Sequence, residues 1–314
     1  MNKHKLWVVE SNGAPRSGKG TITSALTESY ADAAQDETGA DYRAVTYGLL
    51  ENGHLEEGQS ESDIEQAVSK LDNREIADYA AMRYEIVAEQ GDKVLYEPRI
   101  NETVAKIGKI SVVRSAVKVG FTRRVQRVID NPDVNLLFVD GRNLGPVIEK
   151  IEGAELGLRL FVDCQPAEAA RREALRQGVD YQDSSNDEWF MKTKASIKAR
   201  KLDDERRTLD PVCKDEDAIA YWHNDDVMTE TMQYFAKTRG KSIGNIASIL
   251  NTKFRTDGRY GAGAKAVHES RQIYFDTSEI NRNTMINLSR RMVDEALDER
   301  AGLYTSISGE LFRK

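Results

Sequence analysis

One stretch constrains the chain more than any other: Gly13-Ala14-Pro15-Arg16-Ser17-Gly18-Lys19-Gly20-Thr21 lies between an apolar run, Leu6 to Val9, and an amphipathic segment that begins near Ile22. A strand, a glycine-rich turn and a helix in this order are typical of a phosphate-binding loop. The glycines let successive backbone N–H groups converge on phosphate oxygens, and the N-terminus of the helix adds its partial positive charge. The alternative is a glycine-rich surface turn, which the strand, the lysine and the helix together disfavour.

The order of residues after the lysine is informative about the chemistry. Lys19 supplies a mobile cation for the β and γ phosphates, so we expect residues 13 to 21 to bind ATP and Lys19 to act in catalysis. The strict pattern places Ser or Thr directly after the lysine as a magnesium ligand, whereas here Gly20 intervenes and Thr21 follows. We therefore expect Thr21 to contribute to a Mg²⁺ site.

The charge balance limits the kinds of partner. The 314 residues carry a formal net charge of -7, which disfavours a broad nucleic-acid surface or an anionic membrane surface. An anionic substrate must therefore meet a local concentration of Arg and Lys. Cys164 and Cys213 show neither a disulfide framework nor a zinc-binding spacing, and no apolar stretch approaches membrane-spanning length. We expect a cytoplasmic protein.

The first third of the chain is predicted to be mostly helical. Helical spacing continues from Ile22 to about Ala34, and Thr38 or Asp41 can cap a second helix that runs through Leu50. Residues 51–131 are charged and mostly helical by pattern, which indicates an insertion that covers a substrate.

Strands alternate with helices in the rest of the chain. Buried strands are predicted at 134–140, 158–163 and 273–278, and a helix is predicted from about 283 to 297. This alternation predicts an α/β fold with a doubly wound parallel sheet and ligands at the carboxyl ends of the strands. Asp140 ends one strand and can orient Mg²⁺ through water.

A charged run follows near residue 200. Arg200, Asp203, Asp204 and Arg207 have the spacing of one helical face. Taken alone, this pattern favours a solvated face with salt bridges. The phosphate-binding loop shifts the interpretation toward arginines that bind phosphate.

Taken together, these motifs resemble the bacterial cytidylate kinase family, in its long form. The loop is similar to the family's ATP loop, residues 37–43 to its Asp-Ser-Gly-x-x-Tyr-Arg segment, and residues 140–143 to its Asp-Gly-Arg-Asp segment. The charged run is similar to the family's Arg-Asp-x-x-Asp-x-x-Arg. The resemblance covers roughly residues 5 to 220 and the final strand.

The resemblance implies roles for individual residues. Residues implied to bind the acceptor monophosphate are Thr38, Arg43, Ser111, Arg142, Asn143, Arg200, Asp204 and Arg207, with Arg142 and Arg200 also catalytic. Asp204 is implied to contact a ribose hydroxyl. Asn143 replaces the Asp that contacts the cytosine edge, and Arg114, Arg123 and Arg124 compete for the arginine that reads the base. Arg171 and Arg172 occupy the lid position and are implied to bind ATP.

The fold implied is a P-loop nucleoside monophosphate kinase. Its core would be formed by residues 1–50, 132–220 and 272–314, with 51–131 as the helical monophosphate-binding insertion and 221–271 as an extra segment of unassigned role. The activity implied is Mg²⁺-dependent transfer of phosphate from ATP to CMP or dCMP by a protein that we expect to be monomeric. Two alternatives are a kinase for another or modified nucleoside monophosphate, which Asn143 motivates, and a non-catalytic ATP-binding regulatory protein.

Overall fold

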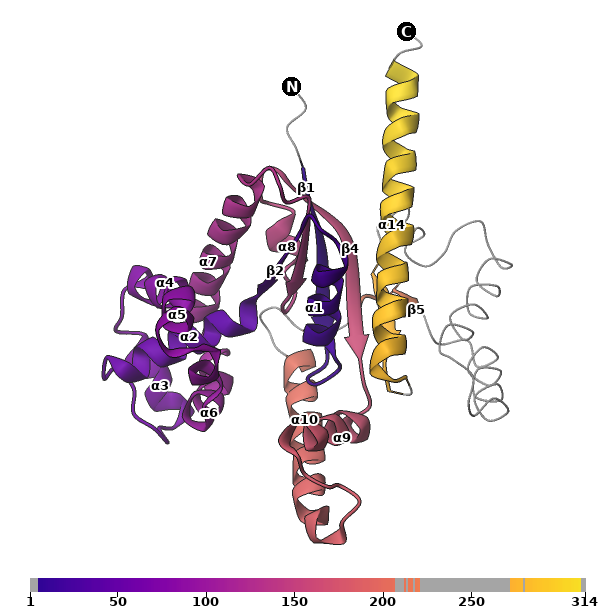
Figure 1. The fold of residues 1–314 in the computed structure, drawn as a ribbon. Helices are drawn as coiled ribbons and strands as arrows, with labels where there is room; N and C mark the ends of the chain where they lie inside the picture. The colour runs from indigo at the N-terminus through magenta and orange to yellow at the C-terminus, as the bar shows by residue number, and fades with distance from the viewer. Residues whose placement is uncertain are drawn as a thin grey trace.

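A computed structural model describes residues 5–206, 212, 214–216, 218–220, 272–278 and 280–311. Its centre is a six-stranded sheet with the order β2-β3-β1-β4-β6-β5, in which all neighbouring strands pair in parallel (Figure 1). The strands are β1 (Leu6–Gly13), β2 (Ala33–Glu37), β3 (Leu136–Asp140), β4 (Ala154–Asp163), β5 (Ile219–Ala220) and β6 (Ile273–Asp276). The predicted parallel α/β sheet is confirmed.

Helices cover both faces of this sheet, which explains why its central strands are apolar. On one face, α1 (Lys19–Ser29) and α14 (Arg282–Leu311) pack against the strands, and the shared core includes Ile22, Leu26, Met292 and Val293. On the other face lie α7 (Ser111–Ile129) and α8 (Gly145–Ile148). Each fully buried aliphatic or aromatic side chain stabilises this sandwich by roughly 1.5–3 kcal/mol.

Helices within residues 38–107 form a separate cluster beside the sheet, which takes in most of the predicted insertion and also α2 (Thr38–Glu51) before it (Figure 1). The cluster contains α2, α3 (Glu61–Val68), α4 (Asn73–Ala81), α5 (Arg83–Gln90), the 3₁₀ helix η1 (Asp92–Tyr96) and α6 (Pro98–Ile107). The Ser60 and Asp72 side chains cap α3 and α4 by accepting backbone hydrogen bonds. The cluster has its own core, formed by side chains such as Leu49, Ile76 and Val117.

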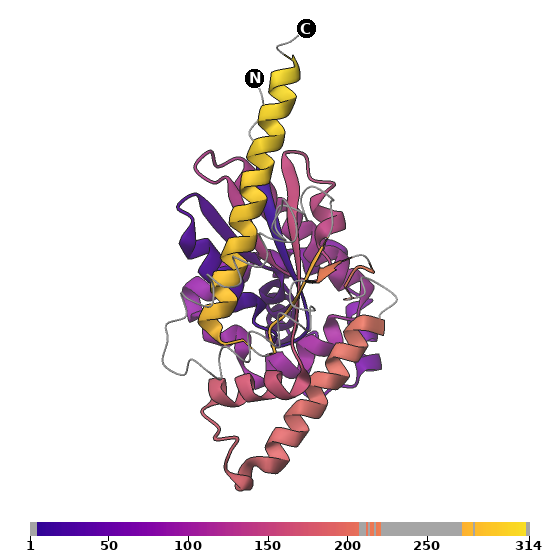
Figure 2. The same cartoon turned by 90° about the vertical axis from the view of Figure 1, so that its right-hand side faces the viewer.

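Two further helices lie at the carboxyl edge of the sheet (Figures 1 and 2). They are α9 (Pro166–Gln177) and α10 (Asp187–Arg206), with the short 3₁₀ helix η2 (Ser184–Asn186) between them. Pro166 opens α9 at a position where its missing N–H costs nothing. We call these helices the lid, because they carry Arg171, Arg172 and Arg200.

The structure corrects two expectations. The helix predicted to reach about Ala34 ends at Ser29, and Ala33–Glu37 forms edge strand β2 by pairing with β3. The hydrophobic pattern of the sequence does not predict β2, because this strand is polar. An edge strand with one solvated side needs few apolar residues. The predicted cap of α2 is also wrong: the N-cap is Glu37, and no side chain caps the helix.

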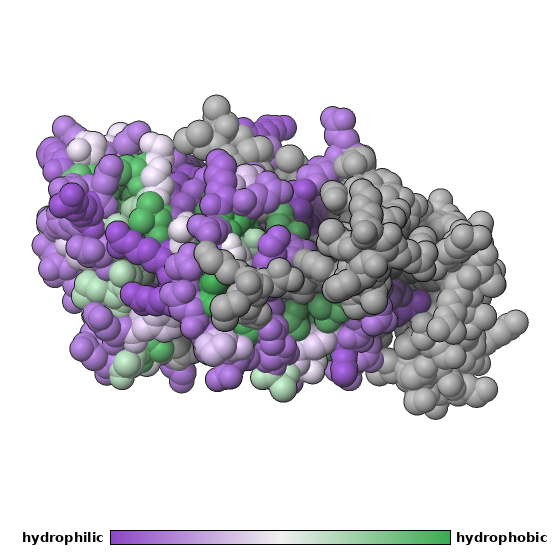
Figure 3. Space-filling model, turned by 90° about the horizontal axis from the view of Figure 1, so that it is seen from above, coloured by the Kyte–Doolittle hydropathy of each residue, from purple (hydrophilic) through white to green (hydrophobic). Residues whose placement is uncertain are grey.

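Figure 3 shows that the described part of the face seen from above is mostly hydrophilic, with hydrophobic residues in small separate groups. Among the described residues, no helix is long and apolar enough to cross a membrane. The extra segment, residues 221–271, lies outside the described residues.

Candidate functional site

The phosphate-binding loop begins at Gly13, the last residue of β1, which pairs with Val162 of β4. Gly13 has φ of +127°, and a Cβ atom there would lie 2.1 Å from the carbonyl oxygen of Val162. Only glycine fits this position. The Ala14 N–H donates to the same Val162 oxygen at 3.0 Å, so the loop is fastened to β4 as it turns toward α1.

Lys19 folds back over this loop. Its Nζ donates to the carbonyl oxygens of Ala14 at 2.6 Å and Gly13 at 3.1 Å. Burial lowers the pKa of Lys19 to about 8, although the nearby Asp140 carboxylate opposes that shift. The lysine therefore lies at the loop with its ammonium poised to exchange carbonyl oxygens for phosphate oxygens.

Asp140 ends β3 directly beside this lysine. The position of a Cβ on Gly20 would lie 3.4 Å from Asp140 Oδ2, so the carboxylate faces the start of α1. Burial raises the pKa of Asp140 to about 6, and the charge of Lys19 is the largest effect in the opposite direction. A carboxylate next to a phosphate loop is thus confirmed at the sheet's carboxyl edge.

The residues present fit a magnesium ion that the nucleotide itself helps to hold. Among the described residues, no cluster of three or more His, Cys, Asp or Glu side chains could enclose a metal. Asp140 and the hydroxyl of Thr21 are both oxygen donors near the loop, and Mg²⁺ characteristically uses one or two protein oxygens together with phosphates and water.

Arginines from four separate parts of the chain surround Asp140 and Lys19. The charges of Arg142 and Arg43 lower the pKa of Asp140. The charges of Arg142, Arg200 and Arg16 lower that of Lys19. Helix α2, the turn after β3, the lid and the loop itself therefore each bring a cation to one place, which suits a ligand with several negative charges.

Arg142 is held by the lid. It follows β3, and its guanidinium forms an ion pair with Asp204 of α10, a residue only 1% exposed. Burial lowers the pKa of Arg142, while Asp140 and Tyr42 raise it. The pair joins two motifs that are 62 residues apart, and Arg207, the last residue of the second motif, lies outside the described residues.

Arg43 reaches the site from α2. Its guanidinium lies over the ring of Tyr96, 4.5 Å from the ring centroid, and 3.6 Å from Glu37 Oε1. Thr38, at the start of the same helix, donates its hydroxyl hydrogen to the carbonyl oxygen of Asp140 at 3.5 Å. The start of α2 is thereby attached to the strand that carries the candidate metal-binding carboxylate.

The three arginines proposed as base readers lie in different surroundings. Arg124 is buried, donates to Asp36 at 2.7 Å and forms an ion pair with Asp41, which Arg83 also contacts. Arg123 is exposed. Arg114 is buried, donates to the carbonyl oxygen of Gly108 at 3.0 Å, and acts electrostatically on Arg142. Of the three, Arg114 is therefore the arginine whose charge acts on Arg142.

Two further residues implied to bind the acceptor are Asn143 and Ser111. Asn143 directly follows Arg142 and has φ of +54°, a left-handed conformation that Asn tolerates. Ser111 is exposed at the first position of α7.

The two lid arginines also differ. Arg171 is half exposed and pairs with Glu168 at 3.2 Å. Arg172 instead donates to the carbonyl oxygen of Ser17 at 2.9 Å and to Thr277 Oγ1 at 3.0 Å. Arg172 thus binds the phosphate loop itself to the end of β6.

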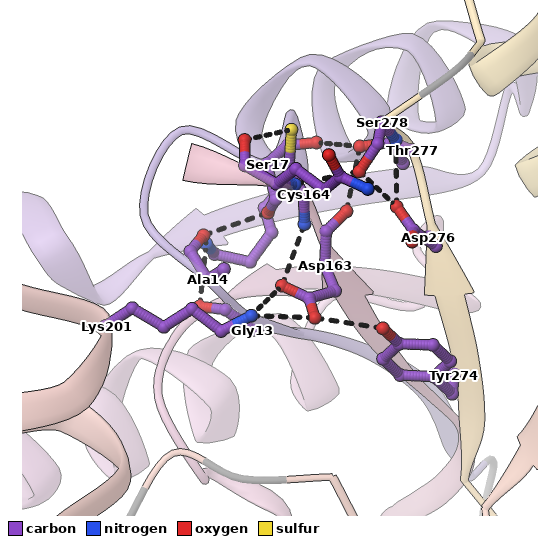
Figure 4. A network of polar contacts seen from close by, with 12 residues as sticks. Gly13, Ala14, Ser17, Asp163, Cys164, Lys201, Tyr274, Asp276, Thr277 and Ser278 are labelled. Atoms are coloured by element: carbon purple, nitrogen blue, oxygen red, sulfur yellow. Dashed lines mark hydrogen bonds and ion pairs between the residues drawn. The ribbon is translucent and has the colours of Figure 1, made fainter. Parts of the chain in front are cut away.

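A network at the ends of β4 and β6 was not identified from the sequence (Figure 4). Asp163 accepts hydrogen bonds from Lys201 Nζ at 2.7 and 2.8 Å and from the Tyr274 hydroxyl at 2.9 Å. Thr277 donates to the carbonyl oxygen of Asp163 at 3.0 Å and to that of Ser17 at 2.8 Å. Asp163 ends a strand as Asp140 does, and that position is the signal by which it could have been found.

Comparisons with known proteins agree with this geometry. Residues 11–237 match the sequence model of the cytidylate kinase family. The cytidylate kinase of Carboxydothermus hydrogenoformans is 29% identical over 212 residues, which cover 66% of this chain and 86% of that protein. The cytidylate kinase of Fusobacterium nucleatum is 27% identical over 212 residues, covering 68% and 87%.

A bifunctional pantoate ligase/cytidylate kinase of Prochlorococcus marinus is 26% identical over 239 residues, which cover 74% of this chain but only 43% of that protein. The chain thus spans less than half the length of this bifunctional relative. The family match extends over most of the chain and includes the phosphate loop, the insertion and the lid. The family is one of phosphotransferases that act on nucleoside monophosphates, and the chain belongs to this cytidylate kinase family.

Proposed function

We propose that the protein transfers the γ-phosphoryl group of ATP to the 5′-phosphate of CMP or dCMP and releases ADP with CDP or dCDP. The observation that carries this proposal is the convergence of Lys19, Arg142 and Arg200 on the carboxyl edge of the sheet beside Asp140. Donor phosphates need one set of cations and an acceptor phosphate needs a second. A protein that only binds ATP has no use for the second set.

Binding and alignment would do most of the catalytic work. The transition state of phosphoryl transfer is loose, so it requires charge neutralisation and an in-line arrangement rather than a covalent nucleophile. Lys19 would hold the β and γ phosphates, and Arg43, Arg142 and Arg200 would hold the acceptor phosphate opposite them. No general base is required, since a phosphate monoester is already largely ionised near pH 7.

Magnesium, when bound, would neutralise charge on the donor phosphates. Asp140 would orient its water ligands, and Thr21 would supply a hydroxyl oxygen near the loop. Arg171 of the lid would bind ATP, and Arg207 would bind the acceptor nucleotide, whereas the contacts of Arg172 with Ser17 and Thr277 favour a role in holding the loop's shape.

The insertion would serve to keep water out of the site during such a reaction. Water must be excluded from the site to prevent ATP hydrolysis. We propose that residues 51–131 close over the acceptor as a unit, hinged against the core formed by residues 1–50, 132–220 and 272–314. The attachment of Thr38 to β3 and the buried charges of Arg124, Asp36 and Asp41 lie at this junction.

The base preference rests on the residues beside Arg142. Asn143 offers an amide donor as well as an acceptor, so it can pair with an edge that an Asp carboxylate cannot. Arg114 is our preferred base-reading arginine, with Ser111 as its proposed partner. If Asn143 shifts the preference, the same site would phosphorylate another or modified nucleoside monophosphate. We propose that the enzyme works as a cytoplasmic monomer in pyrimidine nucleotide metabolism.

The test is ADP release with ATP and Mg²⁺ against each ribo- and deoxyribonucleoside monophosphate. We expect the highest turnover with CMP or dCMP and its loss in Lys19→Ala, while Lys150→Ala, at an exposed lysine, retains it. A different preferred acceptor would retain the kinase but change the substrate, and Asn143→Asp should then move the preference toward CMP. ATP binding without any acceptor-dependent turnover would favour the regulatory protein instead.

A further inference from the structure

Arg16 occupies a position in the phosphate loop where an arginine is unfavourable. Its φ is +59°, and among the described residues the only other non-glycine residue with positive φ is Asn143, which is also at the site. A side chain with a Cβ is disfavoured in this left-handed region. Residues held in such conformations cluster at functional sites, so Arg16 invites the question of what its guanidinium does there.

The side chain lies where three parts of the site come together. Its Nε is 2.8 Å from Glu173 Oε2 on lid helix α9, and the side chain is 46% exposed. Burial lowers the pKa of Arg16, and the charges of Arg176 in the lid, Arg43 on α2 and Tyr96 in the insertion also act on it. The charge of Arg16 in turn contributes to lowering the pKa of Lys19. The guanidinium is therefore placed where lid, insertion and loop meet, which is also where donor and acceptor phosphates must meet.

The contact between Arg16 and Glu173 can be exchanged at low cost. Glu173 is buried, but it also accepts hydrogen bonds from Arg176 at 2.6 and 3.0 Å and from Gln177 at 2.6 Å. If Arg16 leaves, the carboxylate still has a charged partner and an amide donor. No buried charge is left unpaired, which is the usual obstacle to breaking such a pair.

We propose that Arg16 exchanges Glu173 for the terminal phosphate of bound ATP and donates hydrogen bonds to that phosphoryl group during its transfer. This inference rests on the proposed kinase function. In the transfer, an acceptor phosphate oxygen forms a bond to the γ-phosphorus. The bond from γ-phosphorus to the bridging oxygen breaks, and its electron pair stays with ADP. A planar guanidinium between the two phosphates suits the charge that spreads over the γ oxygens.

The backbone conformation provides an unusually clean variant. Arg16→Gly removes the guanidinium and at the same time relieves the left-handed strain, so the protein should fold at least as well as the wild type. Arg16→Lys keeps a charge without the planar fork. Arg290→Ala serves as the matched control, because Arg290 is an exposed arginine on α14 whose partner is Asp294, four residues further along its helix.

The experiment measures the dissociation constants of an imido analogue of ATP and of ADP, both with Mg²⁺, together with the thermal unfolding midpoint. For Arg16→Gly we expect at least tenfold weaker binding of the analogue, ADP binding within twofold of wild type, and an unfolding midpoint that is not lowered. Arg16→Lys should be intermediate, and Arg290→Ala should match the wild type for both nucleotides.

An equal loss for both nucleotides, or no loss for either, would overturn the proposal. Failure of the kinase proposal has a different signature, namely no acceptor-stimulated ADP release from the wild-type protein. The ratio of the two nucleotide affinities is measured without any acceptor, so it decides the role of Arg16 in either case.

Discussion

The ion pair between Arg142 and Asp204 allows a quantitative prediction. Asp204→Asn keeps the shape of the side chain but removes its charge, so the partly buried guanidinium of Arg142 loses its counterion. Two unit charges 4 Å apart interact by about 4 kcal/mol at an effective dielectric constant of 20. Since the Arg142 side chain is 25% exposed and Asp204 2%, water screens part of this energy. About 2–3 kcal/mol should remain.

Two consequences of that magnitude can be measured separately. The free energy of unfolding should fall by about 2 kcal/mol in urea denaturation, with an unchanged m-value. The kcat/KM for the acceptor should fall by roughly 100-fold, because 1.36 kcal/mol corresponds to a factor of ten in rate. The KM for ATP should stay within about threefold of wild type, because the pair lies on the acceptor side.

A double-mutant cycle tests the reasoning behind these values. If Asp204 acts by orienting Arg142, then Arg142→Ala combined with Asp204→Asn should be no slower than Arg142→Ala alone, so that about 2 kcal/mol of coupling energy appears. Losses that add within about 0.5 kcal/mol would refute this and show that Asp204 acts on the substrate independently, as the resemblance to the family implies.

Other features lead to shorter predictions. The pKa of Lys19 is lowered to about 8, so its ammonium loses its proton above that pH; the affinity for ATP should fall as the pH rises through 8, and Lys19→Arg should abolish this dependence in an equilibrium titration. Gly13→Ala should lower the free energy of unfolding by about 3 kcal/mol, seen as a lower midpoint in denaturant, because its Cβ meets the Val162 carbonyl and φ is positive. Arg124→Met leaves Asp36 and Asp41 with less compensation and should cost about 3 kcal/mol in the same assay, whereas Arg123→Met, on the exposed side of the same helix, should not. Chelation of Mg²⁺ should abolish ADP release and leave the unfolding midpoint nearly unchanged.

The fold could be predicted where the sequence alternates clearly between strand and helix. The loop after β1, the carboxylate that ends β3 and the basic helix after β4 all follow from local patterns, and the structure confirms each of them. Edge strand β2 could not be predicted, because its stability comes from pairing with β3, about 100 residues away, rather than from its own polar sequence.

At the site, too, local patterns could be predicted from the sequence and tertiary contacts could not. Spacing on a helix indicated that Asp204 shares a face with Arg200, but no local pattern reveals that its partner is Arg142. The roles of Arg124 and Arg172 depend likewise on tertiary contacts. Their partners come from elements distant in sequence, namely Asp36, Asp41, Ser17 and Thr277. A sequence motif does not distinguish a basic residue that faces a ligand from one that faces a buried carboxylate.

The contact between Thr277 and Ser17 has a consequence for how the protein is made. The two residues are 260 positions apart, and Gly18 of the loop lies against Met285 of α14. At about 5–20 residues per second, the ribosome completes α14 roughly 15–60 s after the loop. During that interval the loop lacks its final support, and the apolar side of α1 is uncovered. Nucleotide binding should therefore appear only late in synthesis. It requires β6 and α14, which follow the residues that match the family model.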